Sequence, residues 1–213
     1  MSEIKAGRIV VLNGAPRSGK SSIVAALQAR EDAVWVNFGV DMHNAAMLPP
    51  RLRPGIGLRP GGEMPGLEVL LPRLYAGLYE SIAAHSRLGF DVVADLGHHD
   101  DYSQPLGILA DCARRLHGLP ALLVGVHCPL DTIMARRRVP VAGREGLYAA
   151  DGEDGAIPAP VRRWQEAVHA HQAYDLELDT SLMSPEACAE AILARLAAGQ
   201  AGPSAFERLE RGI

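Results

Sequence analysis

The sequence predicts an α/β fold in which helices flank a five-stranded parallel sheet. Short apolar runs alternate with longer amphipathic stretches along most of the 213 residues, as they do in repeated strand–helix units. Several runs, ALLVGV among them, are apolar at successive positions, which is typical of strands buried on both faces. A glycine-rich turn follows the first run and opens an amphipathic stretch, which is where a phosphate-binding loop is placed.

Five apolar runs are the expected strands. They cover residues 8–12, 33–38, 91–95, 121–127 and 175–179. The amphipathic stretches are the expected helices, which cover residues 19–30, 67–88, 104–117, 130–138, 160–171 and 185–197. The start of the last helix is the best marked, because Ser184 is a capping residue and Pro185 suits the first helical position.

Two segments interrupt this pattern because proline and glycine crowd them. They are residues 48–65, LPPRLRPGIGLRPGGEMP, and residues 139–158, VPVAGREGLYAADGEDGAIP. Loops of this length in a compact domain are usually functional lids or mobile connections, and both interpretations stay open. We expect one domain over residues 1–197, with a mobile lid at about 136–158 and a short tail, 198–213, of little consequence to the site.

The composition predicts one globular domain that binds no extended nucleic acid. Acidic residues outnumber basic ones, 25 to 21, and the net charge is −4, so any anion site must be local. Cys112, Cys128 and Cys188 are widely spaced, which predicts neither a disulfide framework nor a zinc site. The N-terminus has no apolar leader, and no window approaches the roughly 20 apolar residues of a membrane span. We expect a cytoplasmic protein without a membrane partner, and monomer and oligomer are both compatible with the sequence.

The strongest motif is the turn after the first expected strand, which matches G-x-x-x-x-G-K-[ST] at every fixed position. Its glycines allow backbone N–H groups to point inward at phosphate, and the start of the following helix adds a positive field. Lys20 would contact the β- and γ-phosphates of ATP, and the Ser21 hydroxyl would hold Mg²⁺. The expected phosphate-binding residues are Gly14, Ala15, Pro16, Arg17, Ser18, Gly19, Lys20, Ser21 and Ser22.

Two aspartates after expected strands are the candidate acids. Asp95 closes the run DVVAD, where a P-loop protein places its second Mg²⁺ ligand, and the alternative role is a cap of the next turn. Asp41 follows the second strand in NFGVD, at the carboxyl edge of the sheet beside the P-loop. A carboxylate there would act as general base on a substrate hydroxyl, or it would cap the helix that begins MHNAAM, and the two roles are compatible.

Arginines after the fourth expected strand are candidates for neutralising a phosphoryl group during transfer. Three consecutive arginines on a helix point in different directions, so one site cannot use them all. We expect Arg136 and Arg144 to act catalytically as a lid closes. Arg137 and Arg138 are expected to face solvent.

Two pairs of side chains have competing interpretations. His98 and His99 are adjacent, and adjacent histidines diverge, so a contact with phosphate or acceptor is favoured over a structural metal site. Trp35 and Trp164 are expected to pack in the interior rather than to stack on a base.

A P-loop alone does not distinguish kinases from nucleotide switches and motors. The sequence contains no Asn-Lys-x-Asp segment that would read guanine, and the chain is short for a motor. A small kinase that uses ATP and Mg²⁺ and phosphorylates a small-molecule hydroxyl is therefore the first hypothesis. The alternatives are a nucleoside, nucleotide-sugar or toxin-like kinase, and a regulatory protein that binds ATP without catalysis.

Several segments, in order, resemble the chloramphenicol phosphotransferase family: NGAPRSGKSSIV, FGVD, FDVVADLG, LLVGVHC and YDLELDTS. The resemblance covers residues 9–193, and FGVD and Y-D-x-x-x-D-T are more particular to that family than the P-loop is. It implies an ATP-dependent O-phosphotransferase with a P-loop kinase fold and an antibiotic such as chloramphenicol as acceptor. It also implies that Asp41 is the general base and that Thr180 begins the loop beside the adenine.

The two proline- and glycine-rich segments depart from the family's pattern. Residues 48–65 have a proline-rich sequence of their own, and residues 139–158 look longer and more acidic than in the family. Both are expected to border the acceptor pocket. The resemblance to the family therefore predicts the fold and the chemistry of this chain better than it predicts the identity of the antibiotic.

Overall fold

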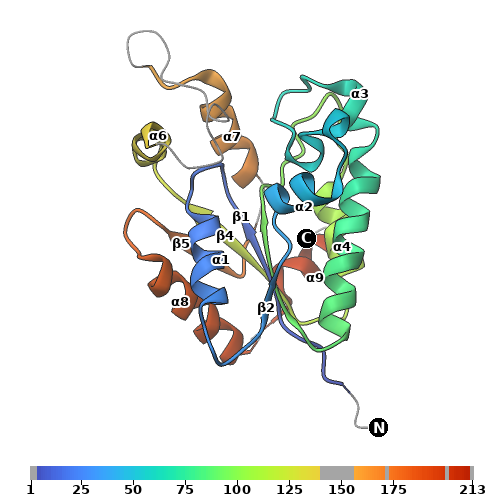
Figure 1. Ribbon diagram of the computed structural model, residues 1–213, viewed down its shortest axis with the longest axis vertical. Helices are drawn as coiled ribbons and strands as arrows, with labels where there is room; N and C mark the ends of the chain where they lie inside the picture. The colour runs from blue at the N-terminus through green and yellow to red at the C-terminus, as the bar shows by residue number, and fades with distance from the viewer. Residues whose placement is uncertain (1–3, 140–155, 171–172, 200–201, 212–213) are drawn as a thin grey trace.

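The computed structural model describes residues 4–139, 156–170, 173–199 and 202–211. Its centre is a five-stranded sheet with the order β2-β3-β1-β4-β5, in which every neighbouring pair is parallel (Figure 1). The strands are β1 Ile9–Asn13, β2 Trp35–Asn37, β3 Asp91–Leu96, β4 Ala121–His127 and β5 Leu176–Asp179. The predicted α/β fold with a five-stranded parallel sheet is therefore confirmed.

Helices connect the strands and flank the sheet. Those described are α1 Lys20–Gln28, α2 Val40–Met47, α3 Pro65–Glu68, α4 Leu71–Arg87, α5 Ile108–Arg115, α6 Leu130–Arg138, α7 Ala159–His169, α8 Pro185–Ala197 and α9 Ala205–Arg211. Two 3₁₀ turns, η1 Pro50–Leu52 and η2 Gly55–Gly57, lie between α2 and α3. Within the described ranges, no helix has both the length and the apolar character that crossing a bilayer requires.

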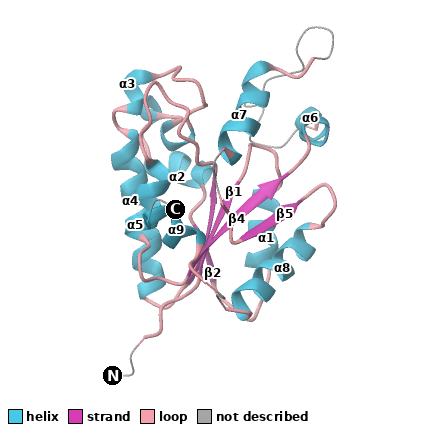
Figure 2. Cartoon of the chain, turned by 180° about the vertical axis from the view of Figure 1, so that it is seen from behind, coloured by secondary structure: helices cyan, strands magenta, loops and turns pink. Residues whose placement is uncertain are grey.

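The sheet is buried on both faces, so alternate side chains of one strand enter two different cores. In β1, Ile9 and Val11 belong to a core that includes residues of α4, α5 and α9. Val10 and Leu12 belong to a second core that includes residues of α1 and α8. Figure 2 shows these two groups of helices on either side of the strands. This two-sided burial explains why the strands read as continuous apolar runs.

Most element boundaries lie close to the predicted ones. All five strands are confirmed, and α6 and α8 begin and end at the predicted residues. The Ser184 hydroxyl caps α8 by accepting the amide hydrogen of Ala187 at 3.2 Å. The single helix expected over 67–88 is instead two helices, α3 and α4. Pro72 accounts for the break, because its ring would collide with the carbonyl of Glu68 in a continuous helix.

The proline-rich segment 48–65 forms only the two 3₁₀ turns before α3 begins at Pro65, as its composition predicts. It is anchored rather than loosely attached. Ile56 and Leu58 are buried, and the Tyr75 hydroxyl of α4 donates to the Ile56 carbonyl oxygen at 2.6 Å. The segment therefore forms a packed wall next to the sheet edge. Most of the second irregular segment, 139–158, lies outside the described residues.

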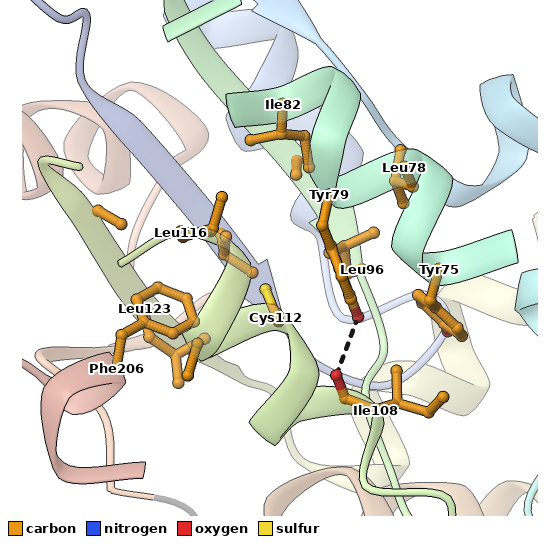
Figure 3. Packing of buried hydrophobic residues seen from close by; sticks show 14 of the residues in the cluster. Tyr75, Leu78, Tyr79, Ile82, Leu96, Ile108, Cys112, Leu116, Leu123 and Phe206 are labelled. Atoms are coloured by element: carbon orange, nitrogen blue, oxygen red, sulfur yellow. Dashed lines mark hydrogen bonds between the residues drawn. The ribbon is translucent and has the colours of Figure 1, made fainter. Parts of the chain in front are cut away.

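The segment expected as a short tail, residues 198–213, contributes a helix to the main core. Ala205 and Phe206 of α9 are buried against α5 and β4, and Figure 3 shows Phe206 beside Leu123. The Ser204 hydroxyl accepts the Glu207 amide hydrogen at 3.1 Å, and a Glu207 carboxylate oxygen accepts the Ser204 amide hydrogen at 2.7 Å. This reciprocal pair is a capping box, and its Ser-x-x-Glu spacing is the sequence signal that predicts the helix.

Candidate active site

The P-loop joins β1 to α1 at the carboxyl edge of the sheet. A Cβ on Gly14 would lie 2.5 Å from the Val126 carbonyl oxygen, so a larger residue does not fit against the neighbouring strand. Gly19 has a φ of 101°, in the region that favours glycine, and a Cβ there would lie 3.2 Å from the Thr180 side chain. The two fixed glycines of the motif are therefore required by the shape of the loop.

Lys20 and Ser21 open α1 and lie against Asp95 near the end of β3. The Lys20 ammonium donates to the carbonyl oxygens of Gly14, at 2.8 Å, and Ala15, at 3.0 Å. It lies 3.5 Å from Asp95 Oδ1, and the Ser21 hydroxyl donates to Asp95 Oδ2 at 2.6 Å. The structure thus brings together the three residues predicted for the phosphates and for Mg²⁺.

The pair formed by Ser21 and Asp95 fits a Mg²⁺ site. Both residues line a cavity, and a hydroxyl and a carboxylate are the hard oxygen donors that Mg²⁺ prefers. Because Mg²⁺ keeps several waters and takes further oxygens from phosphates, one or two protein ligands suffice. Nowhere in the described ranges do three or more His, Cys, Asp or Glu side chains form a group that could hold a metal ion.

The cavity has a volume of about 540 Å³ and opens beside the P-loop, a size that suits a small-molecule ligand. Asp41 lines it from the first turn of α2. The Gly39 amide hydrogen is donated to Asn37 Oδ1 at 2.8 Å, and a Cβ on Gly39 would lie 3.4 Å from Asp95 Cβ. The start of α2 therefore packs closely on β3. As a result, Asp41 shares one cavity with Lys20 and with the predicted Mg²⁺ ligands.

The remaining P-loop residues differ in their exposure to this cavity. Ala15, Pro16 and Arg17 line it. Arg17 has a φ of 70°, and its Nη2 donates to the Val139 carbonyl oxygen at 3.1 Å. Ser22 is exposed on α1. The phosphate contacts expected of these residues stay predictions.

Thr180 and Arg136 support the P-loop through hydrogen bonds. The Thr180 hydroxyl donates to the carbonyl oxygen of Ser18, which is buried, at 2.6 Å. Arg136 donates from Nη1 to Thr180 Oγ1 at 3.0 Å and from Nη2 to the Thr180 carbonyl oxygen at 2.7 Å. Neither is among the described residues that line the cavity, so this geometry gives Arg136 a positioning role. Its catalytic role and the adenine contact of Thr180 stay predictions, and Arg144 lies outside the described residues.

Three arginines of the cavity wall are absent from the predicted site. Arg137 of α6 lines the cavity and is half-buried, which corrects the expectation that it faces solvent. Arg53 and Arg59 line the cavity from the proline-rich segment between α2 and α3. The signal for these two was the sequence RLRPGIGLR, which places arginines in a segment expected to border the acceptor pocket.

The two tryptophans differ in their surroundings. Trp35 is buried in the core that includes α1 and α8, and the Arg8 guanidinium lies 5.1 Å from its ring centre. Packing is therefore confirmed for Trp35. Trp164 of α7 lines the cavity and also meets the His99 ring edge-on at 5.8 Å, so it packs and faces the cavity at once.

His98 and His99 are buried, and neither is among the described lining residues. The His98 Nε2 lies 2.6 Å from the Tyr79 hydroxyl, and burial lowers the pKa of His98 to about 3, so its ring is neutral. The His99 Nε2–H donates to the Leu58 carbonyl oxygen at 3.0 Å, and burial lowers the pKa of His99 as well. This geometry makes both histidines structural and offers no support for a contact with phosphate or acceptor.

Asn13, the last residue of β1, organises the sheet edge next to the P-loop. Its Oδ1 accepts the His98 amide hydrogen at 2.6 Å, and its Nδ2 donates to the Val168 carbonyl oxygen at 2.9 Å and to the Tyr174 hydroxyl at 3.0 Å. The side chain thereby ties β1 to the loop after β3 and to the end of α7. A lone asparagine before a P-loop carries no sequence signal for this role.

Comparison with known proteins points to phosphoryl transfer. A family model described as chloramphenicol phosphotransferase-like protein matches residues 7–197. Two curated relatives from strains of Mycobacterium tuberculosis, each named "Putative O-phosphotransferase", are 28% identical over 195 residues. The match covers 85% of this chain and 78% of each relative.

Solved structures share the fold. The APS kinase CysC of Mycobacterium tuberculosis, in complex with AMPPNP and APS, has a TM-score of 0.63 at 16% identity and covers 90% of this chain and 98% of its own. Shikimate kinase from Acinetobacter baumannii, in complex with shikimate, has a TM-score of 0.54 at 12% identity and covers 93% of this chain and 98% of its own. The predicted P-loop kinase fold is therefore confirmed, and with a family model that matches nearly the whole domain, the chain belongs to the chloramphenicol phosphotransferase-like family of kinase-like O-phosphotransferases.

Proposed function

We propose that this protein transfers the γ-phosphoryl group of ATP to a hydroxyl of a small molecule. One observation carries the proposal: the carboxylate of Asp41 lines the same cavity as the P-loop lysine, Lys20. A P-loop without an adjacent base would suit a nucleotide switch equally well. A carboxylate facing the same cavity provides the general base that a kinase needs for an alcohol acceptor.

The reaction follows from the roles of the residues. Asp41 accepts the proton of the acceptor hydroxyl while the oxygen of that hydroxyl forms a bond to the γ-phosphorus. The bond from the γ-phosphorus to the bridging oxygen breaks, and ADP leaves with that oxygen. Lys20, and Arg137 from the cavity wall, neutralise charge on the phosphoryl oxygens. Bound Mg²⁺ supplies further neutralisation of the phosphates, and Ser21 and Asp95 would hold it.

The proposal defines the acceptor only by its reactive group, a hydroxyl. The family description names chloramphenicol, so an antibiotic alcohol is one acceptor class to assay. Nucleosides and nucleotide sugars form a second class. The non-catalytic alternative is a protein that binds ATP and modifies nothing, and no specific observation favours it over a kinase with an aspartate in its cavity.

The test is an assay of ATP consumption with and without a panel of hydroxylated compounds, in wild type and Asp41→Asn. Asparagine keeps the shape of aspartate but cannot take the proton, so acceptor-dependent turnover should fall roughly 10²- to 10⁴-fold. ATP affinity should hardly change. Asp131→Asn is the matched control, because Asp131 is an exposed acid in the first turn of α6.

Two outcomes would contradict the proposal. Turnover that no compound stimulates would favour the regulatory alternative. Equal acceptor-dependent turnover in wild type and Asp41→Asn would remove the general base from the mechanism. A phosphorylated product identified by mass spectrometry would name the acceptor directly.

A further inference from the structure

The cavity has a charge opposite to that of the whole protein. Its described lining contains five basic and two acidic side chains: Arg17, Lys20, Arg53, Arg59 and Arg137 against Asp41 and Asp95. The chain as a whole carries a net charge of −4. A concentration of positive charge in one hollow of an acidic protein indicates an anionic occupant.

The nucleotide accounts for only some of these charges. Arg17 and Lys20 belong to the P-loop, which is expected to hold the phosphates, and Asp95 lies beside Lys20. Arg53 and Arg59 belong to a different wall, the packed segment between α2 and α3, which follows the helix that carries Asp41. Figure 1 shows α2 and α3 on one side of the sheet edge, away from α6 and α7. The segment that carries Arg53 and Arg59 therefore lies on the same side of the cavity as α2, the helix that carries Asp41.

Hydrogen bonds hold the backbone on both sides of Arg59, while its side chain has no partner among the described residues. The preceding residue, Leu58, is buried, and its carbonyl oxygen accepts a hydrogen bond from His99 at 3.0 Å. Two residues further on, the Gly61 amide hydrogen is donated to the Asp101 carbonyl oxygen at 2.7 Å. Within the described part of the chain, the Arg59 guanidinium makes no hydrogen bond or ion pair, and Arg59 is exposed where it lines the cavity. A guanidinium presented in this way is prepared to bind a ligand.

Arg53 is positioned by the end of α2. Its Nη2 donates to the Ala45 carbonyl oxygen at 2.6 Å, and its Nε donates to the Leu48 carbonyl oxygen at 3.1 Å. These bonds use carbonyl groups that a helix end leaves without partners. They also fix the Arg53 guanidinium relative to Asp41, which lies in the first turn of the same helix. One short helix thus sets the spacing between the base and a fixed positive charge.

An anionic acceptor matches this wall better than a neutral one. A neutral ligand that displaces water from the exposed Arg59 and Arg53 guanidinium groups offers only uncharged acceptors in place of the hydrogen bonds to water, and these are weaker partners than charged ones. A carboxylate or phosphate would restore the hydrogen bonds, because the planar guanidinium forms paired, charge-assisted hydrogen bonds with either group. Val40, Ile56 and Trp164 add apolar surface for the body of the ligand.

We infer that the acceptor carries a carboxylate or phosphate group, which Arg59 and Arg53 bind while Asp41 takes the proton of its hydroxyl. The inference rests on the proposed function and narrows its substrate class. It implies that an uncharged alcohol such as chloramphenicol is a poor acceptor for this chain. The transfer chemistry itself is unchanged.

Binding of probe molecules tests the inference without any turnover. The chain has two tryptophans, and Trp164 lines the cavity, so its fluorescence in a Trp35→Phe background reports on ligands there. The probes are 4-(hydroxymethyl)benzoate, 4-(hydroxymethyl)phenyl phosphate and the neutral 4-(hydroxymethyl)benzamide. Titrations contain saturating ADP and Mg²⁺, so that the probes do not bind at the P-loop. The first two probes distinguish a carboxylate from a phosphate.

We expect at least one anionic probe to bind about tenfold more tightly than the amide, or better. Arg59→Gln should remove most of this preference and leave the weak affinity for the amide unchanged. Arg51→Gln is the matched control, because Arg51 is an exposed arginine of the same segment outside the described cavity lining. Arg53→Gln should also weaken binding of the anionic probe. Thermal unfolding of each variant shows whether it is folded, and so excludes misfolding as the cause.

Three results would each overturn the inference. They are equal binding of the acids and the amide, no binding of either acid, and an unchanged preference for the acids in Arg59→Gln. Its failure is distinguishable from failure of the proposed function. If a neutral alcohol is phosphorylated in an Asp41-dependent reaction that Arg59→Gln does not affect, the kinase stands and the anionic acceptor falls. If the acids bind through Arg59 but no compound stimulates ATP turnover, the inferred anionic ligand is supported and the proposed kinase activity is contradicted.

Discussion

The buried side chain of His98 makes the stability of the fold depend on pH. Its ring lies among Tyr75, Tyr79 and the core that includes α4, and its backbone amide hydrogen is donated to Asn13 beside the P-loop. The neighbouring His99 also disfavours a positive charge on the ring. Because the ring stays neutral in the folded protein and ionises in the unfolded chain, acid favours unfolding.

The free energy of unfolding should therefore fall as the pH decreases. The pKa of His98 is about 3 in the folded protein and about 6.5 when unfolded, so this loss begins near pH 6.5 and continues toward pH 3. Between pH 7.5 and 5.5 this group alone should account for roughly 1.4 kcal/mol. Urea unfolding at the two pH values measures it.

His98→Gln removes the titrating group, so the difference between the two pH values should shrink by about that amount. His117→Gln is the contrasting variant, because the His117 side chain is 70% exposed and its Nδ1 lies 2.8 Å from Glu210 Oε2, so it should not reproduce the effect of removing the buried ring. An unaltered pH dependence in His98→Gln would show that the His98 ring is not held neutral by the fold.

Helix α9 is the element in which local signals and tertiary packing act together. Its capping box forms between Ser204 and Glu207, but a helix as short as Ala205–Arg211 is not stable alone. The Asp175 carboxylate, just before β5, accepts the Ala205 amide hydrogen at 2.7 Å. Burial of Phe206 against α5 and β4 supplies the remaining stabilisation.

Phe206→Ala should destabilise the protein by about 3–5 kcal/mol, because it leaves a cavity in the main core. Chemical unfolding followed by circular dichroism measures the change. Phe90→Ala makes the same substitution at a residue that is 42% exposed, and it should cost less than about 1 kcal/mol. Similar losses in the two variants would mean that α9 is not part of the cooperative core.

The molecule as a whole carries a net charge of −4, whereas the described lining of the cavity at the carboxyl edge of the sheet contains more basic than acidic side chains. A low-dielectric hollow lined by one sign of charge concentrates its field and attracts ligands of the other sign. The overall net charge of −4 acts against this attraction at long range. The cavity must therefore capture anions locally, over distances comparable to its own size.

Ionic strength should reveal this capture. Raising salt from 0.01 M to 0.15 M shortens the screening length from about 30 Å to about 8 Å. We expect the KM for ATP to rise several-fold while kcat changes little, because contacts inside the filled site are screened less. Steady-state kinetics at fixed free Mg²⁺ measures both, with sucrose at matched osmolality as control. A KM that does not respond to salt would contradict the prediction.

The strands, the P-loop and both aspartates were accessible from sequence because their signals are local. An apolar run predicts a strand wherever helices cover both faces, and the fixed spacing from Gly14 to Ser21 encodes a loop closed by neighbouring residues. The predicted helix over residues 67–88 was divided in the structure because a single residue, Pro72, breaks a helix that the longer periodic pattern predicts. The helix with the Ser204 capping box was also locally encoded and could have been predicted.

The cavity wall depends on contacts between residues far apart in the chain. Arg59 is placed by hydrogen bonds that His99 and Asp101 make to its neighbours, and Trp164 reaches the cavity from a helix more than a hundred residues later in the chain. Arg136 and Arg137 are adjacent in sequence, yet one holds the Thr180 loop and the other lines the cavity. Local chemistry alone determined the class of fold and the phosphate loop, because both follow from residues within a few positions of each other. Long-range packing decided which charges surround the acceptor, because the direction of a side chain is settled only by the elements that meet around it.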